Sequence, residues 1–349
     1  MRNMSLVLEG RPYYNFINSL HSEPTKKTYR YTLVRFMRFC QLLSVDKLLD
    51  LRTKDQCIID YLLSQKGYQS KQLSLNAIKK FYEMNDIILN WKKISCYLGA
   101  KQKNKNRGYT HEEIQKVLAI SDQRMKMIIL LLSSSGVRVG ALPELRIHHL
   151  TKLEGRIYKI VVYENSEEEY ITFCTPECTN AIDSYLDYRV RSGEKITPDS
   201  PLIRKQFDIN DLEQIRLKSE PITLGTLHRL IDNFLVKSGI RTVDHTSKSK
   251  RKEVPRAHGF RKFFSTQLVE ADLKTEKRWL LEGHELKGND SSYVRITEKK
   301  LMQEYEKAID LLTIDPANRL RKKVEKLEVE KSQFDRLAAQ LAALEQRIK

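Results

Sequence analysis

The chain has 349 residues, of which 40% are apolar, and its 62 Lys and Arg against 45 Asp and Glu give a formal net charge of +17. That length is more than one hydrophobic core usually organises, so we expect two folded units and an appendage, while the charge favours a polyanionic partner. The longest apolar run, residues 127–132, is far shorter than the roughly 20 residues that cross a bilayer, which excludes a membrane-spanning protein.

Targeting and cysteine signals also limit the function. The first residues lack the apolar core and small-residue cleavage site of a secretory signal, so we expect a cytoplasmic protein. The five cysteines, Cys40, Cys57, Cys96, Cys174 and Cys178, are dispersed, whereas a zinc site normally needs two close pairs of Cys or His ligands. We therefore expect buried, reduced thiols, no metal site and no cofactor.

Residues 1–100 are predicted to form a small all-helical domain. Their apolar residues recur at helical spacing, as in Tyr29, Leu33 and Phe36, and most of the basic residues lie on other faces. Residues 101–109 break this periodicity with alternating cations and amides, which is typical of a basic linker.

A second domain is predicted over residues 110–315. Thr110 and Glu113 form a capping-box pattern, which predicts the start of a helix over 112–120. An apolar helix over 123–134 follows.

A β-hairpin is predicted over residues 156–174, because this stretch alternates in polarity and is rich in β-branched and aromatic types around a polar tip. Pro176 suits the first position of the next helix, which we expect to reach Val190. Further helices are predicted over 223–238 and 260–282.

Residues 316–349 are predicted to form a charged C-terminal helix with apolar residues at steps of three and four. This pattern favours a short coiled coil or a docking helix, with a solvated tail as the alternative. The apolar positions are Leu320, Val324, Leu327, Phe334, Leu337, Leu341, Leu344 and Ile348.

Chemistry-bearing residues follow one another in a characteristic order. Arg138 lies in SSSGVRVGALPEL, His258 and Arg261 lie in RAHGFRKFFSTQL, and His284 precedes Tyr293 by nine residues in LLEGHELKGNDSSYVR. Order, spacing and flanks over about residues 110–315 resemble the tyrosine recombinase family, which includes the lambda-type integrases and the Xer resolvases. The segments TPECTNAIDSYLDYR and SYVRITEKKLMQEYEKAIDLLTI most resemble the integrases of archaeal viruses and plasmids.

The resemblance implies a mainly α fold with a small β-hairpin or sheet, of the α+β class. A helical, SAM-like N-terminal domain would clamp the DNA duplex together with a tyrosine recombinase catalytic domain over 110–315. The implied enzyme is a site-specific recombinase or integrase that cuts and rejoins DNA strands without a metal, through a 3′-phosphotyrosyl bond. Its partners would be double-stranded DNA and further copies of itself, in a tetramer, with no small-molecule substrate.

The residue types suit this chemistry. A phosphodiester gains charge on its oxygens during in-line attack, so a metal-free enzyme needs fixed cations, and Arg138 and Arg261 would supply bidentate guanidinium groups. His258 precedes Arg261 by three residues on one helix face, so it would share the same phosphate and is the candidate base. His284 would donate a hydrogen bond to a phosphate oxygen, and Tyr293 would be the nucleophile.

Two departures from the family pattern concern the same phosphate. The family places a lysine in the hairpin turn to protonate the departing 5′ oxygen, whereas residues 164–169 contain none. Lys159 on the preceding strand is the remaining candidate, although the alternation of a regular strand points it away from position 164. Ala141 replaces an acidic residue that supports the first arginine, and Glu144 could substitute for it.

Two strings of cations are predicted to neutralise DNA phosphates, with solvated loops as the alternative. They are Lys101, Lys103, Lys105 and Arg107 in the linker and Lys248, Lys250, Arg251 and Lys252 in the second domain. Three other functions stay open: a DNA-binding protein of this fold that has lost strand cleavage, a relaxing type IB topoisomerase, and an unrelated phosphatase or nuclease. The last is the most distant, because metal-spaced carboxylates and a P-loop glycine pattern are missing.

Overall fold

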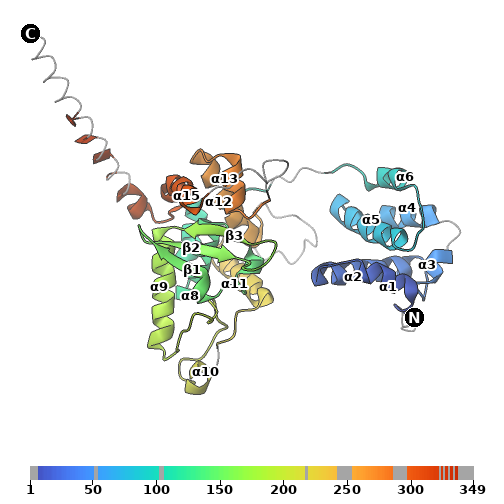
Figure 1. Ribbon diagram of the computed structural model, residues 1–349, viewed down its shortest axis with the longest axis horizontal. Coiled ribbons are helices and arrows are strands. Elements are labelled where there is room, and N and C mark those ends of the chain that lie inside the picture. The colour runs from blue at the N-terminus through green and yellow to red at the C-terminus, as the bar shows by residue number, and fades with distance from the viewer. Residues whose placement is uncertain are drawn as a thin grey trace, which may run out of the picture. The chain divides into compact units, whose positions relative to one another are not determined.

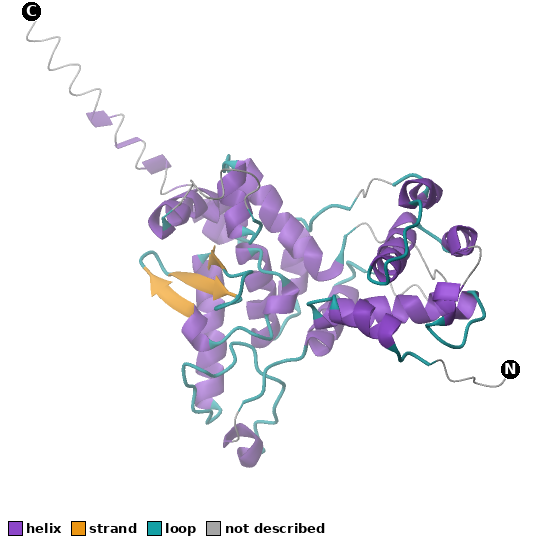
Figure 2. Ribbon diagram, turned by 45° about the vertical axis from the view of Figure 1, so that its right-hand side comes forward, coloured by secondary structure: helices purple, strands orange, loops and turns teal. Residues whose placement is uncertain are grey.

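The computed structural model describes residues 7–50, 54–101, 106–216, 219–241, 254–285 and 297–321, together with 324, 327–328, 331–332 and 335–336. The chain divides into two compact units, Met1–Asn104 and Lys105–Lys349, and Figure 1 labels their elements. Figure 2 shows that the described residues are mainly helical, with one small sheet, which confirms the predicted α+β class.

The first unit is all-helical in its described part. Its core comprises Phe16, Phe36, Phe81 and their neighbours, and the α5 helix packs against α1, α2 and α4. The predicted apolar face is found on α2, where Leu33 and Phe36 are fully buried. The elements are α1 (Arg11–Asn18), α2 (Glu23–Phe39), α3 (Lys47–Asp50), α4 (Lys54–Ser64), α5 (Tyr68–Glu83), α6 (Trp91–Ser95) and the 3-10 helix η1 (Cys96–Leu98).

The second unit surrounds a small antiparallel sheet with helices. Its helices are α7 (His111–Ala119), α8 (Gln123–Ser135), α9 (Pro176–Arg191), α10 (Leu212–Arg216), α11 (Leu224–Lys237), α12 (Arg256–Glu270), α13 (Thr275–Leu281) and α15 (Glu298–Leu312), with 3-10 turns η2 (Val139–Ala141) and η3 (Ile147–His149). The strands are β1 (Leu150–Leu153), β2 (Ile157–Val162) and β3 (Tyr170–Cys174), in the order β1-β2-β3.

Both faces of the sheet are covered. On β3, the Thr172 hydroxyl donates to the Ser135 carbonyl at the end of α8, whereas the Phe173 ring lies against Tyr305 of α15, with ring centroids 5.5 Å apart. Successive side chains of a strand point to opposite faces, so α8 and α15 lie on opposite sides of β3. Every residue of α8 from Met127 to Ser135 is buried, and the helix packs against α9, α12 and β3, as expected of a central core helix.

Local signals predicted most boundaries to within a residue or two. The capping box is present, since Thr110 Oγ1 accepts from the Glu113 amide and the Glu113 carboxylate accepts from the Thr110 amide. Pro176 begins α9, and the predicted hairpin is present as β2 and β3. The β1 strand was not predicted, because its four residues carry little pattern.

One predicted helix is wrong: residues 260–282 form two helices. Asp272 adopts a left-handed backbone conformation with φ +56°, and the Leu273 amide donates back to the Leu268 carbonyl. This arrangement ends α12 in the way that a C-terminal capping motif does, and buried Leu273 holds the turn against the core. The break reorients α13, which carries the segment that ends at His284.

The expectation of buried cysteines is also only partly right. Cys174 and Cys178 are buried, Cys40 and Cys57 are half-buried, and Cys96 is exposed. Toward the C-terminus, the side chains of Leu320, Val324 and Leu327 are all more than half exposed, so the coiled coil stays a prediction. No helix in the described part of the chain is long and apolar enough to span a membrane.

Candidate active site

Three stretches that are distant in sequence meet near Tyr170, at the start of β3. Arg138 follows α8, Arg261 lies on α12, and the third stretch, residues 282–284, follows α13. Hydrogen bonds connect all three stretches. The structure therefore brings Arg138, Arg261 and His284 together. Tyr293, the predicted nucleophile, lies outside the described residues.

Backbone carbonyls hold both guanidinium groups. Arg138 Nη2 donates to the Gly283 carbonyl at 2.7 Å, and Arg261 Nη1 donates to the Gly136 carbonyl at 2.6 Å. Arg261 Nη2 also donates to the Glu282 carbonyl. Each arginine is thus oriented by the backbone of another stretch. A carbonyl carries no net charge, so these bonds fix the position of the arginines and leave their positive charge in place.

Two glycines make this arrangement possible. Gly136 and Gly283 have φ +62° and +64°, a conformation that side chains other than glycine rarely adopt. A Cβ atom on Gly136 would lie 2.1 Å from the Phe264 ring, and one on Gly283 would lie 2.4 Å from the Tyr170 ring. These close approaches place the two carbonyls that bind the arginines.

The arginine cluster is short of negative charge. Arg138 Nη1 is buried and has no hydrogen-bond partner among the described residues, and neither Arg138 nor Arg261 forms an ion pair with a described carboxylate. The predicted support of Arg138 by Glu144 is not present as an ion pair in this part of the chain; the Gly283 carbonyl supports it instead. Burial, followed by the repulsion of Arg138, lowers the pKa of Arg261, yet an arginine stays protonated in proteins.

His284 connects this cluster to a buried carboxylate. Its Nε2 lies 3.2 Å from Arg261 Nη2, and its Nδ1 lies 3.2 Å from an oxygen of Glu282. The Glu282 side chain is 6% exposed, while that of His284 is 45% exposed. Burial lowers the pKa of His284, Arg261 and Arg138 lower it further, and Glu282 opposes them. His284 is therefore held mainly neutral in the free protein.

His258 lies one turn before Arg261 on α12, as predicted, and it is also held neutral. Burial lowers its pKa first, and repulsion from Lys262 and Arg261 lowers it further. A neutral imidazole can accept a proton, so the environment of His258 suits a general base.

Tyr170 was missed by sequence reasoning, because one tyrosine among 16 carries no signal. The guanidinium carbon of Arg138 lies 5.8 Å from the centre of its ring, and its hydroxyl is buried without a partner in the described structure. Burial raises the pKa of Tyr170, while Arg261 and Arg138 oppose this. Its ring packs against Gly283, so we assign it to the wall of the site.

Lys159, the candidate for the missing turn lysine, is engaged elsewhere. It pairs with Phe173 across the sheet, and its Nζ lies 3.1 Å from each carboxylate oxygen of Glu298 at the start of α15. The described residues include no contact of Lys159 with Arg138, Arg261 or His284.

A cluster of metal-ligand types joins Glu164 of the hairpin turn to His148 and His149 of η3. Each Nε2 lies 3.3 Å from the same oxygen of Glu164. However, Nδ1 of His149 accepts from the Arg146 amide, so its Nε2 carries the hydrogen and donates it to the carboxylate. This arrangement favours hydrogen bonding that anchors the turn over metal ligation.

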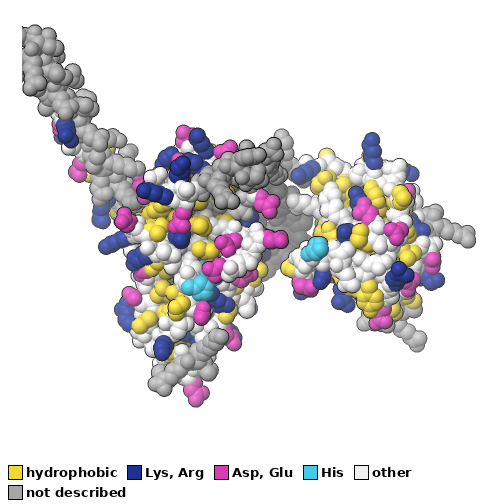
Figure 3. Space-filling model, viewed as in Figure 1, with side chains coloured by type: hydrophobic (Ala, Val, Ile, Leu, Met, Phe, Trp, Pro, Cys, Tyr) yellow, Lys and Arg dark blue, Asp and Glu magenta, His cyan; other side chains and the backbone are white. Residues whose placement is uncertain are grey.

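The predicted phosphate-binding strings lie mostly outside the described residues, where Lys103, Lys105, Lys248, Lys250, Arg251 and Lys252 all fall. Lys101 is exposed, and Arg107 makes a bidentate pair with Glu113 at 2.7 Å. On the face seen in Figure 3, Lys and Arg are interspersed with Asp and Glu. The described residues on this face therefore form no large patch of positive charge alone.

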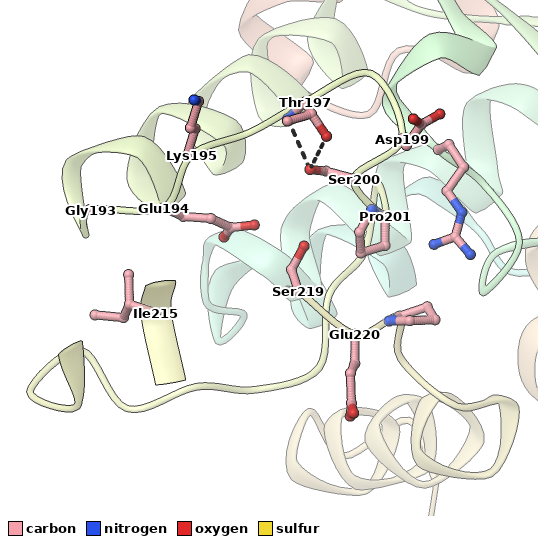
Figure 4. Close-up of a pocket in the computed structure, with 12 residues that line it drawn as sticks. Gly193, Glu194, Lys195, Thr197, Asp199, Ser200, Pro201, Ile215, Ser219 and Glu220 are labelled. Carbon is pink, nitrogen blue, oxygen red and sulfur yellow. Dashed lines mark hydrogen bonds between the residues drawn. The ribbon is translucent and has the colours of Figure 1, made fainter. Parts of the chain in front are cut away.

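A cavity of about 890 Å³ opens elsewhere in this unit, lined by residues 193–195, 197, 199–201 and 219–221 with Arg146 and Ile215. Figure 4 shows Glu194 at its edge and the bonds from Thr197 to the Ser200 hydroxyl. Glu194 is already paired with two buried arginines, and none of the candidate catalytic residues lines this cavity.

A sequence model described as the phage integrase family matches residues 108–307, more than half of the chain. The chain belongs to the phage integrase family. Its relatives include a tyrosine recombinase XerA from Pyrococcus furiosus, 24% identical over 70% of this chain and 77% of the relative. A tyrosine recombinase XerC from Leptospira interrogans is 21% identical over 87% and 94%, respectively. The prediction of a tyrosine recombinase is confirmed.

Solved structures of this family share the fold. A Tn1549 transposon integrase in complex with circular intermediate DNA has a TM-score of 0.55 and 18% identity, covering 82% of this chain and 94% of the other. The site-specific recombinase XerH, bound to its difH substrate, has a TM-score of 0.53 and 16% identity, covering 80% and 78%. At these identities the likeness shows the phage integrase fold.

Proposed function

We propose that this recombinase cleaves and rejoins double-stranded DNA through a 3′-phosphotyrosyl bond at Tyr293, without a metal ion. The observation that carries the proposal is the pair of guanidinium groups of Arg138 and Arg261, which are braced by carbonyls and not neutralised by a described carboxylate. In-line attack on a phosphodiester places extra negative charge on its oxygens, and preorganised cations stabilise that charge. The relatives that are bound to DNA in their structures support the same partner.

Each site residue has a defined task in this mechanism. Arg138 and Arg261 bind the scissile phosphate, and the partnerless Nη1 of Arg138 is available for one of its oxygens. The phenol of Tyr293 attacks phosphorus and transfers its proton to neutral His258. The new bond to the tyrosine retains the energy for religation, as in other covalent catalysis.

The deciding experiment traps the covalent bond. A nicked duplex that carries the attachment site and loses its 5′ fragment after cleavage should accumulate a protein–DNA adduct with wild type and none with Tyr293→Phe. Tyr170→Phe is the matched control, because Tyr170 is the described tyrosine beside Arg138, and it should keep the adduct. An adduct that survives in Tyr293→Phe but is lost in Tyr170→Phe would reassign the nucleophile.

A DNA-binding protein without strand cleavage is the second candidate, favoured by the lysine-free hairpin turn and by the pairing of Lys159 with Glu298. It predicts site-specific binding with no adduct from wild-type protein. A type IB topoisomerase would instead relax supercoiled plasmids that lack the attachment site.

The remaining proposals concern partners and location. We propose that four copies assemble on two attachment sites in the cytoplasm and that the two cationic strings neutralise DNA phosphates. The mass of the DNA complex by analytical ultracentrifugation tests the assembly. Alanine replacement of Lys248, Lys250, Arg251 and Lys252 should lower the slope of log affinity against log salt by roughly 0.9 for each phosphate contact that is lost.

A further inference from the structure

The His284 ring has a defined hydrogen-bonding pattern. Arg261 Nη2 can only donate, so Nε2 of His284, 3.2 Å away, accepts from it. A neutral imidazole then carries its hydrogen on Nδ1, which faces the carboxylate of Glu282 at 3.2 Å. The ring therefore has a buried anion behind Nδ1 and the arginine cluster in front of Nε2.

The Glu282 carboxylate is unusual in its surroundings. It is 6% exposed, and its other oxygen, Oε1, is buried without a hydrogen-bond partner in the described structure. A buried carboxylate normally needs paired donors or a cation. An imidazolium at His284 would supply that cation, whereas a neutral ring supplies a single hydrogen bond.

The hairpin turn contains no lysine that could act as the general acid for the departing 5′ oxygen. Lys159, the nearest candidate, is bound to both carboxylate oxygens of Glu298. His284 has its Nε2 in the arginine cluster, and its ring is partly exposed. Arg138 and Arg261 are committed to the phosphate and His258 is the proposed base, so His284, whose Nε2 contacts Arg261, is the site residue left to supply a proton.

We propose that Glu282 and His284 form a carboxylate–imidazole pair in which protonated His284 is the general acid for the departing 5′ oxygen. His284 is then a catalytic residue and Glu282 a positioning residue that stabilises its cationic form. The inference rests on the proposed function and deepens it, since it assigns the acid of the same cleavage step.

The step balances in protons and electrons. The Tyr293 oxygen forms a bond to phosphorus, and its proton passes to His258. The bond between phosphorus and the 5′ oxygen breaks, its electron pair stays on that oxygen, and the oxygen takes the proton from His284 Nε2. His284 becomes neutral with its remaining hydrogen on Nδ1, toward Glu282. Religation runs in reverse.

Substrate binding would change the charge of His284 in the required direction. In the free protein, burial disfavours the protonated ring most, Glu282 on its own turn favours it, and the cations of Arg261, Arg138 and Arg278 disfavour it further. A bound phosphate offsets the charge of Arg138 and Arg261 and adds negative charge beside the ring, so it acts together with Glu282 in favour of the protonated form. The proton is acquired when DNA is in place.

The test compares two DNA substrates that differ in one leaving atom. On ordinary DNA, His284→Gln should slow adduct formation by about 100-fold or more, within the usual range for general acid catalysis, and Glu282→Gln by about tenfold or more. On DNA with a 5′-bridging phosphorothiolate, whose thiolate departs without a proton, both variants should regain the wild-type rate within a few-fold. Glu285→Gln, which removes the neighbouring exposed carboxylate, is the matched control and should equal wild type on both substrates.

A pH profile separates positioning from a purely structural role. Removing the Glu282 charge destabilises the imidazolium, so cleavage by Glu282→Gln should decline at a lower pH than cleavage by wild type. DNA binding, measured in parallel, should be unchanged in this variant, which establishes that the site is folded.

Three outcomes would overturn the proposal. If Glu282→Gln forms the adduct on ordinary DNA at the wild-type rate, Glu282 has no role in cleavage. If His284→Gln and Glu282→Gln are slowed equally on both substrates, the pair does not protonate the leaving group. If the phosphorothiolate DNA restores the cleavage rate of Lys159→Ala and not that of Glu282→Gln, Lys159 is the general acid. In all three the wild-type adduct at Tyr293 still forms, so cleavage itself stands; if wild type gives no adduct on either substrate, the proposed function fails as well.

Discussion

Two groups of buried arginines in the second unit have opposite electrostatic surroundings. Arg189 and Arg204 share the carboxylate of Glu194, with N–O distances of 2.6 and 2.7 Å, and all three side chains are at most 5% exposed. Arg138 and Arg261 are instead held by backbone carbonyls and form no described ion pair. The first group is paired with a buried carboxylate that offsets one of its two positive charges, whereas the second has no carboxylate partner in the described structure and keeps both charges for a ligand.

This difference shows why burial alone does not identify a functional arginine. Arg189 is fully buried and donates to Glu194 and to the carbonyls of Pro201 and Leu202, so each of its three guanidinium nitrogens already has a partner inside the fold. Arg138 is less buried but has an Nη1 without a partner. An arginine whose surroundings orient it without neutralising it is prepared to bind an anion.

The largest expected effect is on stability and concerns the arginines that are paired with Glu194. Glu194→Ala should lower the free energy of unfolding by about 3–5 kcal/mol, because it leaves two buried charges unpaired. Urea unfolding followed by circular dichroism measures it. Replacing Arg189, Glu194 and Arg204 together by Met, Leu and Met should recover part of the loss, although the carbonyls of Pro201 and Leu202 lose their donor. No recovery would mean that these residues stabilise the fold by packing and not by charge.

The second effect is on catalysis and concerns the group that keeps its charge. Arg138→Ala or Arg261→Ala should slow DNA cleavage by about 10²–10³-fold, the usual loss for one donor to a developing oxyanion, while DNA binding changes less than cleavage. Single-turnover adduct formation and a binding titration measure the two. Arg256→Ala is the control on the same helix, since Arg256 is half exposed and paired with Asp232. Equal loss of binding and cleavage would contradict a role in the transition state.

A smaller effect on stability is expected at Gly283, whose carbonyl accepts the hydrogen bond from Arg138. Gly283→Ala should lower the free energy of unfolding by about 1–3 kcal/mol, because its Cβ meets the Tyr170 ring at 2.4 Å and its φ is +64°. Gly225→Ala is the control, since nothing lies within 4 Å of a Cβ there. If both variants have the wild-type urea midpoint of unfolding, the close approach of Gly283 to Tyr170 does not contribute to stability.

The smallest effect is a pH dependence of stability that arises from the pairing of Glu194 with Arg189 and Arg204. Burial opposes ionisation of Glu194, but hydrogen bonds from Arg189 and Arg204 outweigh it and hold its pKa below the ordinary value. The stability from this group is therefore fully present above the unfolded pKa of about 4.3 and is lost as the pH falls through the lower folded pKa. The difference in urea midpoint between wild type and Glu194→Gln should shrink over that acidic range. A constant difference would exclude this linkage.

Much of the fold was predictable because its signals are local. The Thr110 capping box, Pro176 at the start of α9 and the alternating hairpin all depend on neighbours within a few residues. The break between α12 and α13 was not predicted, because a left-handed Asp272 is stabilised by the burial of Leu273 in the tertiary core. Local propensity cannot report that burial.

The candidate site divides in the same way. The residue types and order of Arg138, His258, Arg261 and His284 were readable from the sequence, because phosphoryl chemistry requires cations and proton carriers in a recognisable arrangement. Glu282, Tyr170 and the pairing of Lys159 with Glu298 were not, since each depends on which side chains meet across the fold.

The sequence by itself determined the helical and hairpin elements, the positive charge and the identity of the residues that can act on a phosphate, because these follow from chemistry and from short-range geometry. Only the tertiary structure decided which arginines are paired with a carboxylate and which are not. Arg138 and Arg261 are held by partners more than 100 positions away, Gly283 and Gly136, whereas Glu194 lies five and ten positions from Arg189 and Arg204. No local pattern encodes the distance between such partners, which packing of the whole unit sets.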